Sequence, residues 1–242
     1  MKHYTDIFID FDDTLYDTHG NAVTALEETF RHFHLEQYFD DPQVFYDDYW
    51  RTNIDLWGRY ANGEISREYL IVERFRHPLC KSEKVRVQSE KAASAFKDYC
   101  LQVSDVFLDY CSNKPGVVEG AHELMDYLKQ KGYRLHMCSN GFHEVQYKKL
   151  AACGLRDYFD TIILSEDAGF NKPDPRFFDY AFKQSNAKRE STVMIGDNYS
   201  TDIQGAVNAG IDTIFFNRWP DYPATGPLTH EVKSLKEIMA II

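Results

Sequence analysis

The sequence predicts an α/β fold in which a parallel sheet carries helices on both faces and an all-helical domain is inserted after the first strand. From residue 117 onward, short apolar runs typical of buried strands alternate with longer patterns typical of helices. This alternation indicates right-handed strand–helix–strand units and therefore a parallel, Rossmann-like sheet. The interval from about residue 18 to residue 111 has little strand pattern and several helical patterns.

Five short apolar runs are predicted to form the strands of the sheet. They are Ile7–Asp10, Arg134–Ser139, Thr161–Ser165, Thr192–Gly196 and Thr213–Phe216. The first run stands alone near the N-terminus, and the other four follow the interval that lacks strand patterns.

Helical patterns connect these strands. Between the last four strands, helices are expected at His143–Cys153, Pro175–Lys183 and Thr201–Ala209. A further helix at about Glu119–Lys131 precedes the second strand. Gly132 is its expected end, because glycine readily adopts the left-handed conformation that terminates helices.

The interval without strand patterns is expected to fold as a separate helical domain. Its residues 18–111 leave residues 1–17 and 112–242 for the core. Apolar side chains at three- and four-residue spacing mark its first helix, and they are Val23, Leu26, Phe30 and Phe33.

The inserted domain has features that suit a cover over a substrate. Its two connections to the core, near Tyr16–Thr18 and Asn113–Gly116, are the expected hinges of a closing motion. The domain is rich in aromatic residues, and Trp57 and Tyr60 are candidates for stacking on a planar group. Packing within the domain's own core is the alternative explanation for each aromatic residue.

Composition and charge limit the class of partner. The 242 residues carry a net charge of −11, without the clustered Lys and Arg that nucleic acids or acidic membranes require. No segment approaches the ~20 apolar residues of a membrane span, and the N-terminus lacks the apolar core of a secretory signal. The five cysteines form no CxxC pair, which is typical of free thiols in a reducing compartment. We therefore expect a cytoplasmic monomer or small homo-oligomer that binds neither nucleic-acid polymers nor membranes.

Polar residues cluster where the predicted strands end. Asp10 and Asp12 follow the first strand, and Ser139-Asn140-Gly141 follows the second. Lys172 lies beyond the third strand, and Gly196-Asp197 closes the fourth. Ligands of open α/β sheets bind at the carboxyl ends of the strands, so these clusters are expected to converge. Each cluster alone could be a turn, a helix cap or a solvated lysine, but their joint occurrence at strand ends favours a functional site.

Two of the clusters predict a magnesium site. Asp10 and Asp12 are two positions apart and point to the same side of an extended backbone. Their carboxylates repel each other, and Asp197 arrives beside them on another strand. Mg²⁺ prefers a few carboxylate oxygens together with water and phosphate oxygens, so its binding would offset this repulsion.

The same clusters contain the groups that phosphoryl transfer needs. Asp10 can attack phosphorus as a nucleophile, while Asp12 can give a proton to the leaving oxygen and later take one from water. Lys172 supplies positive charge. The Ser139 hydroxyl and the N–H groups of Asn140-Gly141 supply hydrogen-bond donors. A small phosphorylated metabolite is therefore the expected substrate.

Four segments resemble, in order, the motifs of the haloacid dehalogenase-like hydrolase superfamily: DFDDTL, SNG, KPDP and GDNYSTD. The helical insertion is similar to the cap of that superfamily's first cap class. The resemblance implies a nucleophile at Asp10, a general acid/base at Asp12, and a magnesium site formed by Asp10, the Asp12 carbonyl and Asp197. It also implies an acid at Asp202 that supports these ligands from behind. Ser139 and Lys172 match the superfamily's phosphate-binding positions, and Thr14, Asn140 and Gly141 are further candidates for binding the phosphate.

Within the superfamily, residues 138–182 look most like the pyrimidine 5′-nucleotidase branch. This likeness implies a phosphatase that hydrolyses nucleoside 5′-monophosphates of the uridylate or thymidylate type. An aromatic-rich cap is suited to stacking a planar base. A phosphatase of sugar phosphates or of other metabolites is the alternative.

Other activities fit these residues less well. A 2-haloacid dehalogenase needs neither magnesium nor a second carboxylate such as Asp12. The sugar-phosphate mutases of the superfamily usually carry Gly-Val where this chain has Asp13-Thr14. A phospho-receiver domain is shorter and lacks a large insertion, and a non-catalytic binding protein has no need for Asp12.

Overall fold

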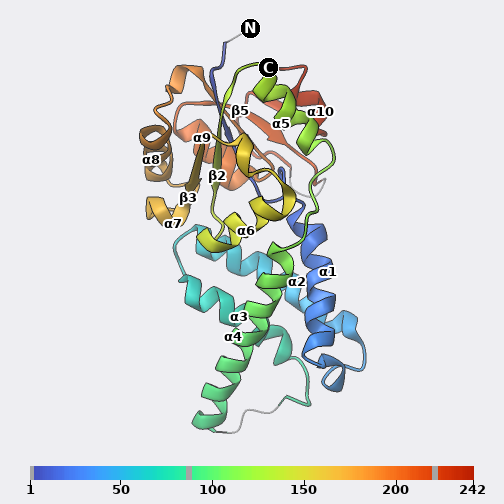
Figure 1. Cartoon of the computed structure of the whole chain (residues 1–242). Coiled ribbons are helices and arrows are strands. Elements are labelled where there is room, and N and C mark those ends of the chain that lie inside the picture. The colour runs from blue at the N-terminus through green and yellow to red at the C-terminus, as the bar shows by residue number, and fades with distance from the viewer. Residues whose placement is uncertain (1–2, 86–88, 220–222) are drawn as a thin grey trace. The chain divides into compact units, whose positions relative to one another are not determined.

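The computed structural model describes residues 3–85, 89–219 and 223–242. The chain divides into two compact units (Figure 1), a core unit of residues 1–19 and 114–242 and a cap unit of residues 20–113. Sequence patterns put the two boundaries two residues earlier in the chain.

The core unit is built on a parallel sheet. In the described residues, six strands follow the order β3-β2-β1-β4-β5-β6, and every neighbouring pair is parallel. The strands are β1 Asp6–Ile9, β2 Arg134–Ser139, β3 Thr161–Leu164, β4 Thr192–Gly196, β5 Asp212–Phe216 and β6 His230–Val232. The predicted α/β fold is confirmed, and the five predicted strands lie within one residue of their expected bounds. β6 escapes prediction because its three residues, HEV, contain no apolar run.

Helices connect the strands of the core unit. They are α5 Ala121–Gln130, α6 His143–Cys153, α7 Ser165–Ala168, α8 Pro175–Ser185, α9 Gln204–Asn208 and α10 Leu235–Ile238. α6 has the predicted bounds. α5 ends just before Gly132, whose φ of +83° is the left-handed conformation expected there. The four-residue helices α7 and α10 are too short to produce a helical pattern in the sequence.

One predicted helix is replaced by a wider turn. The helix expected over residues 201–209 begins instead as a π-helical turn, Tyr199–Ile203, which leads into the short α9. The Asn198 side chain accepts hydrogen bonds from the backbone N–H groups of Ser200 and Thr201 and so starts this turn two residues before the expected helix.

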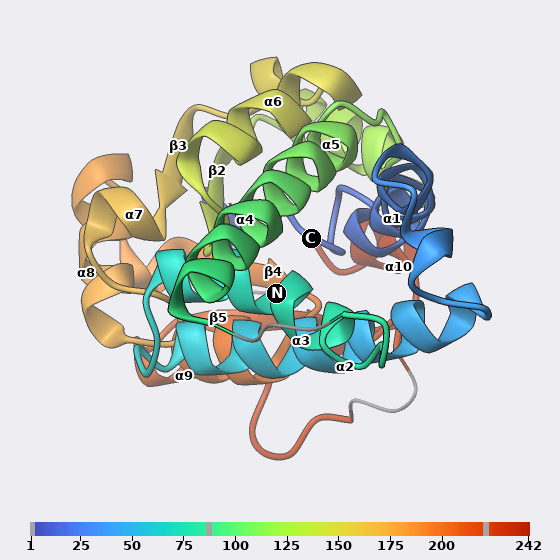
Figure 2. The same ribbon diagram turned by 90° about the horizontal axis from the view of Figure 1, so that it is seen from below.

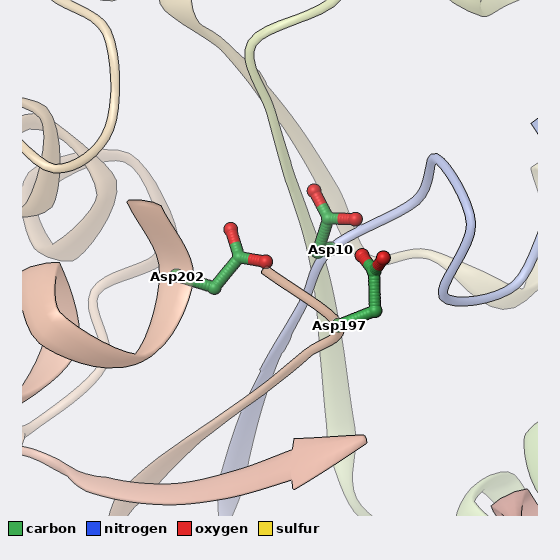
Figure 3. A group of neighbouring side chains, drawn as sticks. All are labelled: Asp10, Asp197 and Asp202. Carbon is green, nitrogen blue, oxygen red and sulfur yellow. The ribbon is translucent and has the colours of Figure 1, made fainter. Parts of the chain in front are cut away.

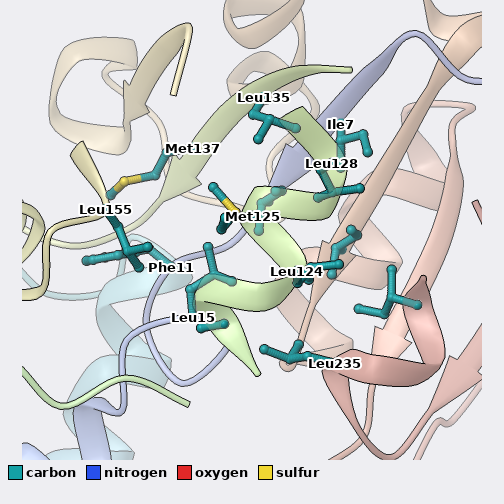
Figure 4. Packing of buried hydrophobic residues seen from close by; sticks show 14 of the residues in the cluster. Ile7, Phe11, Leu15, Leu124, Met125, Leu128, Leu135, Met137, Leu155 and Leu235 are labelled. Atoms are coloured by element: carbon teal, nitrogen blue, oxygen red, sulfur yellow. The ribbon is translucent and has the colours of Figure 1, made fainter. Parts of the chain in front are cut away.

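Alternate residues of β1 enter two different hydrophobic cores. Ile7 and Ile9 pack on one face of the sheet with Leu124 and Leu128 of α5. Figure 4 shows α5 lying against β1 and β2 on this face. Phe8 packs on the other face, where the side chains of α8 and α9 cover the sheet. Helices therefore cover both faces, as the near-continuous apolar strands predict.

The cap unit is all-helical in its described residues. Its α-helices are α1 Thr18–His32, which begins in the last residues of the first core segment, α2 Pro42–Ala61, α3 Arg67–Leu79 and α4 Glu90–Ser112. Asp41, Ser66 and Ser89 cap the N-termini of α2, α3 and α4 by accepting backbone hydrogen bonds. Figure 2 shows α2 and α3 side by side. Among the described helices of the whole chain, none has both the length and the hydrophobicity needed to cross a bilayer.

Aromatic rings fill the interior of the cap unit. The ring of Tyr49 lies 5.1 Å from that of Phe75 and 5.4 Å from that of Phe107, measured between centroids. Trp57 and Tyr60, the candidates for stacking on a planar group, are half-buried and contact each other edge to face at 5.6 Å. Much of the aromatic content of the insertion therefore forms the core of the cap unit.

Candidate active site

The central strands bring predicted site residues to one edge of the sheet. β1 lies between β2 and β4, and Asp10, Ser139 and Asp197 stand at or directly after the ends of these strands. The strand order reverses at β1, because β2 and β3 follow on one side of it and β4 to β6 on the other. Open α/β sheets bind ligands at such a switch point.

Three carboxylates meet at this edge of the sheet. Oxygen atoms of Asp10, Asp197 and Asp202 lie within 4.8 Å of one another. Figure 3 shows these side chains converging from the end of β1, from the end of β4 and from the turn that follows β4. The cluster contains the Asp10 and Asp197 carboxylates of the predicted magnesium site together with Asp202, the acid expected behind them, but it does not include the Asp12 carboxylate.

Burial and mutual repulsion disfavour negative charge in this cluster. Burial, with the neighbouring charges of Asp202 and Asp12, raises the pKa of Asp10 to about 7, although Lys172 acts in the opposite direction. Burial and the charge of Asp10 hold the pKa of Asp197 well above its usual range. A dication beside Asp10 and Asp197 would favour their charged forms, and carboxylate oxygens are the ligands that Mg²⁺ prefers. The cluster therefore fits a magnesium ion.

The Thr14 hydroxyl ties Asp10 to Asp197. Its oxygen lies 3.1 Å from Asp10 Oδ2 and 3.2 Å from Asp197 Oδ1, and it accepts the backbone N–H of Asp197 at 3.1 Å. A hydroxyl has one hydrogen, so the two carboxylates share it. The Thr14 side chain is fully buried, so it orients the carboxylates, and a phosphate contact by Thr14 would have to come from its backbone.

Lys172 is a buried cation beside the carboxylates. Its Nζ donates to Asp10 Oδ1 at 2.6 Å, to Asp202 Oδ1 at 2.7 Å and to the Cys138 carbonyl oxygen at 2.7 Å. Burial by itself would lower the pKa of Lys172, but the two carboxylates outweigh it and hold the pKa above its usual range. Lys172 is therefore charged at neutral pH.

The Asn140 side chain holds the backbone of Lys172 in place. Its Nδ2 donates to the Lys172 carbonyl oxygen at 2.9 Å, and its Oδ1 accepts the Lys172 N–H at 2.8 Å. These two bonds join the loop after β2 to the loop that leads into α8. The Asn140 side chain thus positions Lys172, which leaves the backbone N–H of Asn140 as the group expected at a phosphate.

Asp202 is held through both of its oxygens. Oδ1 contacts Lys172, and Oδ2 accepts the backbone N–H of Asn198 at 3.1 Å. A Cβ at Gly196 would collide with the Asp202 side chain. The glycine at the end of β4 therefore allows Asp202 to reach the lysine.

The Asp12 carboxylate is bound by a separate set of donors. Thr18 Oγ1 donates to Oδ1 at 2.5 Å, Lys149 Nζ forms an ion pair with the same oxygen, and Gln146 Nε2 lies 2.5 Å from Oδ2. Burial would raise the pKa of Asp12, but Lys149 and these hydrogen bonds outweigh it and lower the pKa. The Asp12 side chain is thus held apart from the three-carboxylate cluster.

Ser139 is hydrogen-bonded to the loop and to the helix that follow β2. Ser139 is buried at the end of β2, and its Oγ accepts the Gly141 N–H at 3.0 Å and a hydrogen bond from Gln146 Nε2 at 2.6 Å. Gln146 therefore contacts both Asp12 and Ser139, two residues expected to act on a phosphate.

Sequence patterns do not single out Gln146 and Lys149. Both lie on the buried side of α6, together with Val145 and Leu150. The available signal is a glutamine and a lysine at positions where a helix packed on a sheet normally carries apolar residues.

The two connections between the units are joined by hydrogen bonds. The Tyr16 hydroxyl donates to the Lys114 carbonyl oxygen at 2.8 Å, and the N–H of Asp17 donates to the Gly116 carbonyl oxygen at 3.2 Å. Both expected hinge segments therefore run side by side.

Comparisons with known proteins find a matching family and relatives that are similar over nearly the whole chain. The model of the haloacid dehalogenase-like hydrolase family matches residues 7–210, which include all the site residues described above. The pyrimidine 5′-nucleotidase YjjG of Escherichia coli is 31% identical over 238 residues, which cover 98% of this chain and 96% of the relative. The pyrimidine 5′-nucleotidase PynA of Streptococcus pneumoniae is 30% identical over 239 residues, with 98% and 94% covered.

A solved structure is similar along the whole chain. It is the magnesium-bound crystal structure of the HAD-hydrolase YfnB from Bacillus subtilis, which is described as revealing interdomain movement. Its TM-score is 0.82 at 27% identity, and the match covers 99% of each chain.

Proposed function

The chain belongs to the haloacid dehalogenase-like hydrolase family, and on that premise we propose that it is a magnesium-dependent phosphatase of nucleoside 5′-monophosphates. One observation carries the proposal, namely that the buried Asp10, Lys172 and Asp202 and the half-buried Asp197 form one cluster at the carboxyl edge of the sheet. Phosphoryl transfer is catalysed mainly by positioning and by neutralising charge, and this cluster supplies both.

In the first proposed step, a carboxylate oxygen of Asp10 attacks the phosphorus of the substrate. The negative charge of the bound phosphate favours the protonated form of Asp12. The bond between phosphorus and the nucleoside oxygen breaks, and Asp12 gives that oxygen its proton. The nucleoside leaves as an alcohol, and the phosphoryl group is held on Asp10 as an acyl phosphate.

In the second proposed step, water releases the phosphoryl group. Asp12, now a carboxylate, takes a proton from a water molecule as the water oxygen attacks phosphorus. The bond between phosphorus and the Asp10 oxygen breaks, inorganic phosphate leaves, and both aspartates return to their starting states.

The negative charge of the transferred phosphoryl group must be neutralised during the reaction. Asp10, Asp197 and the backbone carbonyl of Asp12 would hold Mg²⁺, which supplies positive charge to the phosphoryl oxygens when it is bound. Lys172, fixed by Asn140, adds a second positive charge. The Ser139 hydroxyl would donate a hydrogen bond to the phosphate.

The choice of nucleotide substrates rests on the relatives. Two of them, each similar over nearly the whole chain, are pyrimidine 5′-nucleotidases. We assign selection of the nucleoside to the cap unit, residues 20–113, whose aromatic residues are suited to a planar base. The hydrogen-bonded segments at Tyr16–Thr18 and Asn113–Gly116 would then be the hinges of cap movement.

A substrate panel tests the proposal. The purified protein is assayed for phosphate release from uridylate, thymidylate and several sugar phosphates, with Mg²⁺ and with EDTA. We expect turnover only with Mg²⁺, the highest kcat/KM with a pyrimidine nucleotide, and no turnover by Asp10→Asn. Activity that is insensitive to EDTA would refute the mechanism, and a sugar phosphate that exceeds every nucleotide in kcat/KM would refute the substrate class.

A further inference from the structure

Helix α6 buries two polar side chains beside the site. Gln146 is fully buried and Lys149 is 6% exposed. Residues three apart lie on the same side of a helix, so the two side chains point in similar directions. α6 begins two residues after Gly141, and both side chains therefore lie close to the loop that carries Ser139.

Gln146 links the predicted acid/base to the predicted phosphate contact. Its Nε2 lies 2.5 Å from Asp12 Oδ2 and 2.6 Å from Ser139 Oγ, and an amide nitrogen has two hydrogens to donate. The other amide atom, Oε1, is buried without a hydrogen-bond partner in the described part of the chain. Leaving a buried acceptor such as Oε1 unpaired costs free energy. The amide keeps this orientation because the two contacts of Nε2 offset that cost.

Gln146 also restricts what the Ser139 hydroxyl can bind. Ser139 Oγ accepts hydrogen bonds from the Gly141 N–H and from Gln146 Nε2. A hydroxyl oxygen accepts through two lone pairs, and both are used here. The O–H hydrogen is left to donate, which suits an anionic oxygen such as that of a phosphate.

Gly141 gives Gln146 the space for these contacts. A Cβ at position 141 would collide with the Gln146 side-chain amide. The glycine of the SNG segment is therefore required by the side chain of Gln146, in addition to any role of its backbone in a turn.

Lys149 holds the other oxygen of Asp12. Its Nζ forms an ion pair with Asp12 Oδ1, and the same oxygen accepts a hydrogen bond from the Thr18 hydroxyl at 2.5 Å. Lys149 Nζ also lies 5.1 Å from the centroid of the Tyr16 ring. With Gln146 on Oδ2, both oxygens of Asp12 are fixed by side chains of α6. In the proposed mechanism, Asp12 gives a proton to the leaving oxygen and then takes one from water. Holding its carboxyl group in one position favours both proton transfers.

We propose that Gln146 and Lys149 are positioning residues for phosphoryl transfer. Gln146 sets the spacing between the Asp12 carboxyl group and the Ser139 hydroxyl, and Lys149 sets the direction of Asp12. The inference rests on the proposed phosphatase function. If the two residues served stability alone, their replacement would lower activity towards every phosphate ester equally.

A comparison of two leaving groups tests the role of Lys149. The alkoxide released from uridylate needs a proton, whereas p-nitrophenolate is a stable anion and needs none. Lys149→Met should therefore lower kcat/KM for uridylate by roughly 10²-fold, a typical general acid contribution, and leave kcat/KM for p-nitrophenyl phosphate near the wild-type value. Lys148→Met, at the exposed neighbouring position on α6, is the control and should change neither. Equal losses with both esters would overturn the role of Lys149.

A second variant tests Gln146. Gln146→Met keeps a similar shape without the N–H groups, so the Ser139 hydroxyl is no longer fixed as a donor. KM should rise for both esters, and kcat for uridylate should fall as well because Asp12 is also released. An unchanged KM for both esters would overturn the role of Gln146.

Two further results separate the possible failures. Urea denaturation reports whether each variant is folded, and Lys149→Gln replaces Lys149→Met if the latter does not fold, with the same selective loss expected. If the wild-type protein with Mg²⁺ hydrolyses neither ester, the proposed function fails. If the wild type is active and the Lys149 variants lose both activities equally, only this inference fails.

Discussion

Asp10 and Lys172 form a buried ion pair, with 2.6 Å between Oδ1 and Nζ, although they are 162 positions apart in the chain. The same Nζ also contacts Asp202 at 2.7 Å. One lysine thus partly neutralises a cluster that contains three carboxylates. Removal of the lysine would leave buried negative charges unpaired. The free-energy cost of these unpaired charges exceeds the stabilisation that the ion pair itself provides.

Lys172→Ala should therefore destabilise the protein in the absence of metal. We expect a loss of about 3–5 kcal/mol in the free energy of unfolding, measured by urea denaturation in EDTA. Mg²⁺ should restore part of this loss, because a dication can neutralise the same carboxylates. Activity should fall by roughly 10²- to 10³-fold, as when one stabilising donor is removed. Lys183→Ala, at an exposed position on α8, is the control, and an equal stability of the two variants would contradict the prediction.

Asp10 should make the stability of the metal-free protein depend on pH. Its pKa is about 7 in the folded state and ~3.9 in an unfolded chain, so the folded state binds more protons between these values. The stabilising contribution is therefore complete below about pH 4 and is lost as the pH rises to about 7. In EDTA, the wild type should lose stability relative to Asp10→Asn over this range, as measured by urea denaturation.

Magnesium should change the sign of this pH effect. A bound dication favours the Asp10 carboxylate, so with saturating Mg²⁺ the wild type should gain stability relative to Asp10→Asn as the pH rises. Parallel curves for the two proteins in EDTA would show that Asp10 does not titrate in this range.

The sequence predicts the parts of the site that are set by the sheet. Asp10, Ser139 and Asp197 each close an apolar run, because buried parallel strands are apolar along their length and polar where they reach the ligand edge. Their convergence follows from the strand order, in which β1 lies between β2 and β4.

The sequence does not predict contacts that depend on tertiary packing. Gln146 and Lys149 are buried because Asp12, more than 130 positions away, accepts their hydrogen bonds, and no local pattern records that. The same holds for Asp202, which reaches Lys172 because the turn after β4 is π-helical and is started by the Asn198 side chain.

Asp197 should control the affinity for magnesium. Asp197→Ala removes a carboxylate of the cluster, so the Mg²⁺ concentration that gives half-maximal activity should rise. The increase should exceed roughly 10-fold, the typical effect of replacing a residue that only orients a metal ligand. Asp179→Ala, at an exposed position on α8, should leave the Mg²⁺ dependence unchanged. An Asp197→Ala protein with the wild-type Mg²⁺ requirement would remove Asp197 from the metal site.

The cap unit contains a buried cation whose partner can be tested. Arg74 is 2% exposed, and its Nε and Nη2 lie 3.1 Å and 2.6 Å from Ser104 Oγ. Its guanidinium carbon lies 5.7 Å and 5.2 Å from the ring centroids of Phe75 and Phe107, and burial lowers the pKa of Arg74. Within the described residues, no carboxylate forms an ion pair with it. Ser104 is therefore the main polar partner of a buried charge.

Ser104→Ala should destabilise the protein mainly because it leaves the Arg74 guanidinium unpaired. We expect a loss of about 1–3 kcal/mol in the free energy of unfolding, the cost of leaving a buried polar group unsatisfied. In an Arg74→Met background the charge is absent, and Ser104→Ala should then cost much less, because a lone serine hydroxyl can bond to a backbone carbonyl of its own helix. A double-mutant cycle measured by urea denaturation gives the difference directly. Equal losses in the two backgrounds would mean that the packing of Ser104, and not its bond to Arg74, stabilises the cap unit.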